Sequence, residues 1–173
     1  MKTIGEIMAQ IGAILLSVTD TDGAQLFGRV ENYDATDLQR ALSELVLHDA
    51  SLALVIFNGA RWEREAAGPL KLTLRRTIEM TVLVSDRAFS EPRQAVFGGD
   101  ECTGVLPLAE TILPLLTTRL FADAEAVELL PTGVDLLEVA EENNPQPGRK
   151  LAAITLQARG GVLQAATSRH PIR

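Results

Sequence analysis

The clearest alternation of apolar and polar positions in the chain runs from Leu70 to Ser85, LKLTLRRTIEMTVLVS. Its even positions are apolar except for Arg76, and its odd positions are polar except for Leu83. This period of two predicts a β-strand. At roughly 3.3 Å per residue such a strand would reach about 50 Å, so we expect it to bend, bulge or protrude beyond its own core.

Arg76 is the one interruption of the apolar row. A charge on the buried side of a strand marks either the place where the core cover ends or an edge protected against aggregation. The alternation holds on both sides of Arg76, so either end of the strand can be the one that protrudes. A protruding row that contains Leu72 and Leu74 would need cover from another molecule.

Helical spacing of apolar residues predicts three helices. The first, at 3–18, has a capping box at Thr3 and Glu6, which favours an amphipathic helix over a signal peptide. The second is expected after Asp34 and ends near His48, with an apolar stripe of Leu38, Leu42, Leu45 and Val46. The third is expected at 105–121, with one side lined by Leu108, Ile112, Leu115, Leu116 and Leu120. We expect Asp34 to cap the second helix and Pro114 to kink the third. No segment has the length of apolar sequence that a membrane span needs.

Four further strands are expected, at 25–33, 52–57, 134–140 and 151–159. The run at 52–57, LALVIF, is apolar throughout, so it should be covered on both faces. The last two strands are joined by a turn-rich NNPQPG segment and should form a hairpin. We expect loops at Gly59–Pro69 and Asp86–Thr103.

These elements predict a single α+β domain at 1–160, with a mostly antiparallel or mixed β-sheet flanked by helices, followed by a flexible tail at 161–173. The composition of the 173 residues, 46% hydrophobic and 23% charged, is typical of one globular domain with a sizeable core. The net charge of -7 argues against binding to nucleic-acid backbones. One cysteine and two histidines leave little material for a disulfide framework, a zinc site or histidine-based catalysis.

The string GGDE at 98–101 matches four letters of the GGDEF signature of diguanylate cyclases. In that family the glycines approach nucleotide phosphates and the acidic pair serves metal and the attacking hydroxyl. Here Cys102 replaces the aromatic residue, and the expected flanking strands are missing. We therefore interpret the segment as a loop in which Asp100 or Thr103 caps the next helix.

Two other candidate sites are weaker. Asp20, Asp22 and Glu31 have the spacing of three EF-hand ligands, but an alanine and a glutamine fill positions where a ligand and a glycine are needed, so an ordinary turn is expected. Cys102 has no histidine close in sequence to activate it as a nucleophile. The chain thus lacks a recognisable catalytic, cofactor or metal site, and we predict that it is not an enzyme.

The segment Arg61-Trp62-Glu63-Arg64 is the best candidate for a contact surface, because it places the only tryptophan between two arginines. Tryptophan and arginine are enriched where proteins bind each other. The alternative is a solvated loop with Trp62 folded back on the sheet. Candidate contact residues, together with those of the long strand, are Arg61, Trp62, Arg64, Leu72, Leu74 and Arg76.

Four phrases of the sequence carry a family resemblance: VENYDATDLQRAL, LALVIFNGARWE, TIEMTVLVSDRAF and GVLPLAETILPLLTTRLF. With the order of elements, they resemble the Mu-like prophage protein family that is grouped with bacteriophage tail terminator, or tail completion, proteins. The resemblance covers about residues 1–160 and departs from the family at the GGDEC segment and the C-terminal tail. Its motifs are structural patterns rather than catalytic signatures.

The resemblance implies a subunit of a ring, commonly hexameric, at the end of a tail tube. Such a ring stops tube polymerisation and offers a surface to the head connector, without a cofactor. The protein would be made in the bacterial host cytoplasm and reside in the virion tail, with itself, the tube and the connector as partners. The alternatives from other classes are a small nucleotide enzyme using the GGDE string and a monomeric binding module.

Overall fold

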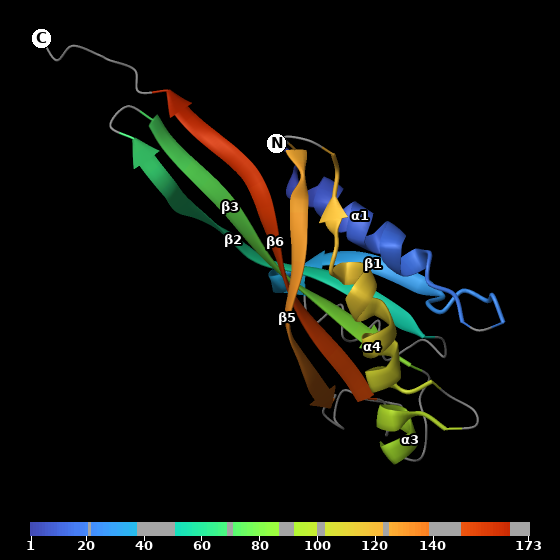
Figure 1. Ribbon diagram of the computed structural model, residues 1–173. Helices are drawn as coiled ribbons and strands as arrows, with labels where there is room; N and C mark the ends of the chain where they lie inside the picture. The colour runs from blue at the N-terminus through green and yellow to red at the C-terminus, as the bar shows by residue number, and fades with distance from the viewer. Residues whose placement is uncertain are drawn as a thin grey trace, which may run out of the picture.

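A computed structural model describes residues 1–20, 22–37, 51–68, 71–86, 92–99, 103–122, 125–138 and 150–166. In this part of the chain the fold is α+β, with a curled, mixed six-stranded sheet and three α-helices (Figure 1). The helices are α1 (Ile4–Leu16), α3 (Pro92–Phe97) and α4 (Val105–Leu116). The strands are β1 (Arg29–Asp34), β2 (Leu52–Gly68), β3 (Lys71–Ser85), β4 (Arg119–Leu120), β5 (Val127–Glu138) and β6 (Lys150–Ala166). The predicted fold class is confirmed.

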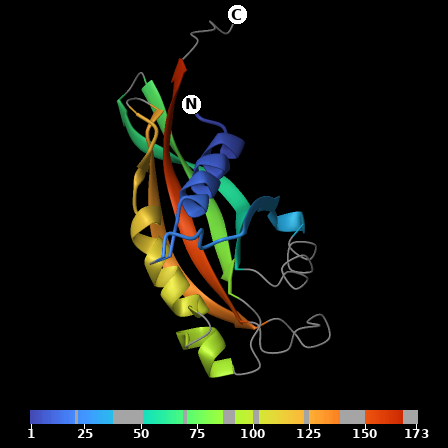
Figure 2. The same cartoon turned by 90° about the vertical axis from the view of Figure 1, so that its right-hand side faces the viewer.

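The strands lie in the order β1-β2-β3-β6-β5-β4. Among the described strands β1 and β2 are parallel, and the other neighbouring pairs are antiparallel. In Figure 2, β6 runs nearly the whole length of the molecule, from near α3 and α4 at the bottom to the top, where the strand ends at Ala166. The predicted pairing of the last two strands is confirmed by the β5–β6 ladder, although the connecting turn at 139–149 lies outside the described residues.

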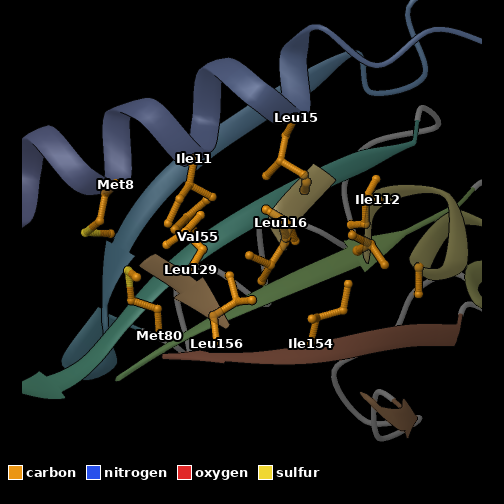
Figure 3. Close-up of a cluster of buried hydrophobic side chains, with 14 of the residues drawn as sticks. Met8, Ile11, Leu15, Val55, Met80, Ile112, Leu116, Leu129, Ile154 and Leu156 are labelled. Atoms are coloured by element: carbon orange, nitrogen blue, oxygen red, sulfur yellow. The ribbon is translucent and has the colours of Figure 1, made fainter. Parts of the chain in front are cut away.

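The main core lies between the sheet and the helices α1 and α4, which both cover the same face. Figure 3 shows Met8, Ile11 and Leu15 of α1 pointing toward the strands beside Ile112 and Leu116 of α4. Burying each such aliphatic side chain is worth roughly 1.5 to 3 kcal/mol. Their spacing of three or four residues explains why the sequence pattern identified both helices.

A second, smaller cluster lies on the opposite face of the sheet. It consists of Leu52, Leu54, Ile56, Leu83, Leu151 and Ala153. The intervening residues of β2, Ala53 and Val55, are buried in the main core. The prediction that 52–57 is covered on both faces is therefore confirmed, because successive side chains of a strand point to opposite sides.

The N-terminal helix begins with the capping box expected from the sequence. The Thr3 hydroxyl oxygen accepts from the Glu6 N–H at 3.2 Å, and the Glu6 carboxylate accepts from the Thr3 N–H at 2.8 Å. These contacts lower the pKa of Glu6 by stabilising its charged form. In the part of the chain that the structure describes, no helix is long and apolar enough to cross a membrane.

The long strand is confirmed as β3, and it protrudes beyond the core, while bulges lie in its partner strands at Asn58 of β2 and Gly161 of β6. It pairs with β2 on one side and β6 on the other, with a register shift against β6 between Arg75 and Arg76. At the left of Figure 1 these three strands continue beyond the helices as a ribbon of their own. The strand is longer than the core because its neighbours extend with it.

The predicted loop at Gly59–Pro69 is wrong, because β2 continues to Gly68. A register shift lies at Asn58, and from Gly59 to Glu65 the strand pairs continuously with β3. Polar residues occupy both faces here, and none of the described helices contributes to a core over this part of the sheet. Without one apolar face, the segment lacks the alternation that marks a half-buried strand.

Other boundaries differ from those expected. The strand predicted from Gln25 begins at Arg29, the helix predicted to 121 ends at Leu116, and the strand predicted from Val134 begins at Val127. Pro114 occupies the last turn of α4, and the chain then turns into β4. Leu115, expected in the apolar stripe, is 42% exposed.

Three further predictions concern segments that are only partly described. The expected loop at 86–103 contains α3, whose first residue is proline, a favoured start for a helix. The expected tail at 161–173 begins as strand, because β6 runs to Ala166. Asp34 accepts from the Thr36 and Asp37 N–H groups at a short 3-10 helix, Ala35–Asp37, but the rest of the helix expected to end near His48 lies outside the described residues.

Candidate subunit interface

We define the arm as the three-stranded extension of the sheet formed by Asn58–Gly68 of β2, Lys71–Arg76 of β3 and Gly160–Ala166 of β6. β1 pairs with β2 only up to Phe57, and β5 pairs with β6 only up to Gly160. The arm therefore contains no other described strand. Its backbone is held by the two ladders that β3 makes with its neighbours.

Burial along β3 identifies the end of the strand that leaves the core. Ile78, Met80 and Val82 are at most 1% exposed, and Arg76 is 6% exposed. The next residue of the same row, Leu74, is only half-buried. The cover supplied by the helices thus ends at Arg76, and the protruding end is Lys71–Arg75. Of the two readings of Arg76, the structure supports the one in which the charge marks the limit of the covered row.

The Arg76 side chain joins the arm to the N-terminus. Its Nη2 donates to the Lys2 carbonyl oxygen, and its guanidinium lies 5.8 Å from the centre of the Trp62 ring. Its Nε has no hydrogen-bond partner among the residues that the structure describes. Burial lowers the pKa of Arg76, because a desolvated guanidinium loses hydration. The cation–π contact with Trp62 offsets part of that cost.

The N-terminus is itself tied to the segment before β5. The ammonium of Met1 and the Lys2 Nζ lie 3.0 and 3.3 Å from the Glu125 carboxylate. Both cations lower the pKa of Glu125. Lys2 also lies 5.0 Å from the centre of the Phe121 ring. These contacts place the start of the chain at the base of the arm, beside Arg76.

Four of the six candidate contact residues share one face of the arm. Trp62 lies opposite Arg76 in the β2–β3 ladder, and Arg64 lies opposite Leu74. Directly opposed residues of a ladder project to the same side of the sheet. Trp62 is 40% exposed and Arg64 is also exposed, whereas Arg76 is buried beneath the tryptophan. We call Trp62, Arg64 and Leu74 the arm face.

The other two candidates are placed differently. Arg61 lies on the opposite side of the sheet, where it forms ion pairs with Glu63 and Glu79. These acidic partners raise its pKa. Leu72 lies opposite Ala165 in the β3–β6 ladder, but its side chain is outside the described part of the structure. Arg61 thus lies on the other face of the arm from Trp62 and Arg64, and all three residues lie on a strand instead of in the expected loop.

The chemical candidates gain no support from the described residues. Asp100, Glu101 and Cys102 lie outside them. Asp20 uses its Oδ1 to accept from the Asp22 and Ala24 N–H groups, which is the geometry of an ordinary turn. Within the described ranges, no group of three or more His, Cys, Asp or Glu residues is placed to hold a metal ion.

The sequence reasoning missed one feature of the surface, the outer edge of β5. β4 pairs with Val127 and Glu128, and the Leu129 N–H donates to the Thr118 carbonyl, so the residues of β5 from Leu130 onward have no ladder partner on that side within the described chain. Four apolar side chains of this segment are 38–49% exposed: Leu130, Val134, Leu136 and Leu137. The continuous strand from Val127 was obscured by Pro131 and Gly133, which usually interrupt strands.

Comparison with known proteins gives no relative from which a function can be transferred. No family model and no curated protein matches the chain. The functional argument must therefore be based on the arm and the sheet edge.

Trp62→Ala tests the arm face. The side chain is partly exposed over Arg76, so its removal should lower the free energy of unfolding by about 1 kcal/mol, the size of an exposed cation–π contact. Binding to another subunit or to a tail component should weaken by about 2 kcal/mol or more, as for a tryptophan at the centre of an interface. Thermal melting and analytical ultracentrifugation measure the two quantities. A large fall in melting temperature with unchanged association would show that Trp62 belongs to the subunit core.

Proposed function

We propose that this protein is a structural phage or prophage tail protein, a tail terminator or completion subunit that forms a ring at the end of the tail tube. The observation that supports it best is the arm, a strand ribbon that extends past the helices and exposes Trp62 and Arg64 beside the half-buried Leu74. An extension of this kind adds little to the core of its own subunit. Its composition is that of a surface that binds protein.

The ring would be a hexamer, and its further partners would be the tail tube and the head connector. The number of subunits and these partners derive from the resemblance of the sequence to tail terminator proteins. The arm is compatible with a ring because a contact between two different surfaces, repeated around a closed axis, leaves no arm without cover. The protein would act without a cofactor, in the virion tail, after synthesis in the host cytoplasm.

Light scattering over a range of protein concentrations tests the self-association. We expect a concentration-dependent oligomer whose mass approaches six subunits, each contact burying at least about 1,000 Å². Polymerising tail-tube protein from the phage or prophage that carries this gene tests the role. Addition of the protein should shorten the tubes, and electron microscopy should show a ring at their ends.

Two results would contradict the proposal. One is a protein that stays monomeric at high concentration and leaves tube length unchanged. The other is metal-dependent production of a cyclic dinucleotide from GTP that the double variant Asp100→Ala, Glu101→Ala abolishes. On the proposed function this double variant should assemble like the wild type, with a loss of stability no greater than the ~1 kcal/mol of a helix cap.

A further inference from the structure

We propose that the open edge of β5 in one copy of the chain receives the arm of the next copy through the free edge of β2. The inference rests on the proposed function for the statement that copies associate, and it adds the two surfaces that meet. In this contact the β-sheet of one subunit continues into the β-sheet of its neighbour.

The receiving surface is the part of β5 beyond β4. An open strand edge presents unpaired backbone N–H and C=O groups, which bind another strand readily. Such edges are usually protected by proline, bulges or charges, and β5 has Pro131 and a register shift between Pro131 and Gly133. Past them, Val134, Leu136 and Leu137 are 38–49% exposed with only Asp135 between them. This part of the edge is apolar and has little protection of its own.

The entering surface is the outer edge of β2 in the arm. β1 covers β2 from Leu52 to Phe57 and goes no further, so Asn58–Gly68 has no ladder partner on that side among the described residues. The open segment of β2, Asn58–Gly68, and the open segment of β5, Leu130–Glu138, are similar in length. Both are long enough for a ladder of several hydrogen-bonded pairs.

The charges of the two surfaces favour pairing of an arm with a β5 edge over pairing of two arms or of two β5 edges. The two arm strands of the β2–β3 hairpin, Arg61–Arg76, carry five basic and two acidic residues, whereas Val127–Glu138 carries three acidic residues and no basic one. In a chain with a net charge of -7, the arm is therefore a local basic region. Opposite charges on the two surfaces favour their encounter and fix the partner.

The same charges disfavour symmetrical contacts. Two β5 edges would bring acidic strands together, and two arms would bring basic ones together, so each like-with-like pairing carries a repulsion that the mixed pairing lacks. The two segments also form opposite edges of the sheet. In the strand order, β2 lies toward the β1 end and β5 lies toward the β4 end. A contact between two different surfaces of this kind is head-to-tail and closes into a ring when the rotation allows it.

Cross-linking between two differently substituted proteins tests the contact. In a Cys102→Ser background, one protein carries Ala60→Cys on the β2 edge and the other carries Leu136→Cys on the β5 edge. Both positions are exposed. A short bismaleimide should link the mixed pair and give little product with either protein alone. The control replaces Ala60→Cys by Ala13→Cys on the exposed side of α1, which should remove the product.

Charge reversal in trans provides the second test. Arg64→Glu and Asp135→Arg should each weaken self-association about tenfold or more, and an equimolar mixture of the two variants should restore association of the reversed surfaces to within about threefold of wild type. Both residues are exposed, so the folded subunit should melt normally. If the wild type forms oligomers but the mixed pair is not cross-linked and the mixed variants do not regain association, this inference is wrong and the proposed ring still stands. A wild type without oligomers on or off the tube would overturn both.

Discussion

Leu74→Glu should leave the subunit folded and prevent its assembly, whereas Val82→Glu should unfold the subunit. Both residues belong to the same apolar row of β3, eight positions apart, and they differ in cover. Val82 is fully buried beneath the helices, while Leu74 is half-buried on the arm face. The contrast separates the part of the strand that stabilises the subunit from the part available to a neighbour.

The size of each effect follows from the environment of the new carboxylate. At Val82 it has no cation or donor in the core and would cost more than about 4 kcal/mol, a large share of the 5 to 15 kcal/mol that holds a domain folded. At Leu74 the carboxylate can reach water, so stability should fall by about 1 kcal/mol. Self-association should weaken by about 2 kcal/mol or more, because the charge would be buried in the interface.

Circular dichroism melting and light scattering on the two variants measure these outcomes. Thr73→Glu is the matched control, because it places the same charge one residue away on the opposite side of the arm. It should assemble more nearly like the wild type. If Leu74→Glu forms wild-type oligomers, the arm face is not part of the contact.

The sequence identified the elements whose packing leaves a periodic signature. Most apolar even positions of β3 and the spacing of Met8, Ile11 and Leu15 in α1 both follow from packing in the main core, so the pattern alone was sufficient. The capping box of Thr3 and Glu6 is local as well. Elements defined by neighbours within a few residues were thus the ones predicted correctly.

The sequence predicted the β3 strand of the arm but not the β2 strand beside it. Its β3 strand shows the alternation, but its β2 strand has charged residues on both faces, since Glu63 and Arg64 are both exposed. Such a strand forms because β3 offers it a hydrogen-bonded ladder. The cause of the strand is therefore its partner, which no local pattern of Gly59–Pro69 reveals. For the same reason the sequence placed Trp62 in a loop.

The start of α4 at Val105 agrees with the prediction, but its capping residue was predicted incorrectly for a related reason. We expected Asp100 or Thr103 to cap this helix, but the N-cap residue is Gly104, which has no side chain to do so. The Gly104 N–H donates instead to the Asp86 carboxylate at 2.7 Å, and the same carboxylate accepts from the Ser51 hydroxyl. The anchor thus comes from the end of β3, a contact across eighteen residues that capping rules cannot anticipate.

Gly104→Ala should therefore destabilise the protein strongly. Gly104 has a φ of 80°, a region that residues with a side chain rarely adopt. A β-carbon there would lie 2.2 Å from the Gly98 nitrogen and 2.9 Å from the Gly98 α-carbon, so backbone atoms would have to move. Movement of Gly104 would also lengthen its hydrogen bond to Asp86, which attaches α4 to the end of β3.

We expect Gly104→Ala to lower the free energy of unfolding by about 3 kcal/mol or more, from backbone strain, displaced packing and the weakened anchor together. For a domain of this size that lowers the melting temperature by roughly 6 to 12 °C. Gly5→Ala in α1 is the control, because a β-carbon there meets nothing within 4 Å and alanine favours the helix. Differential scanning calorimetry should show that control melting at or slightly above wild type. If Gly104→Ala melts with the control, the close approach of Gly98 and Gly104 does not determine how α4 is attached to the sheet.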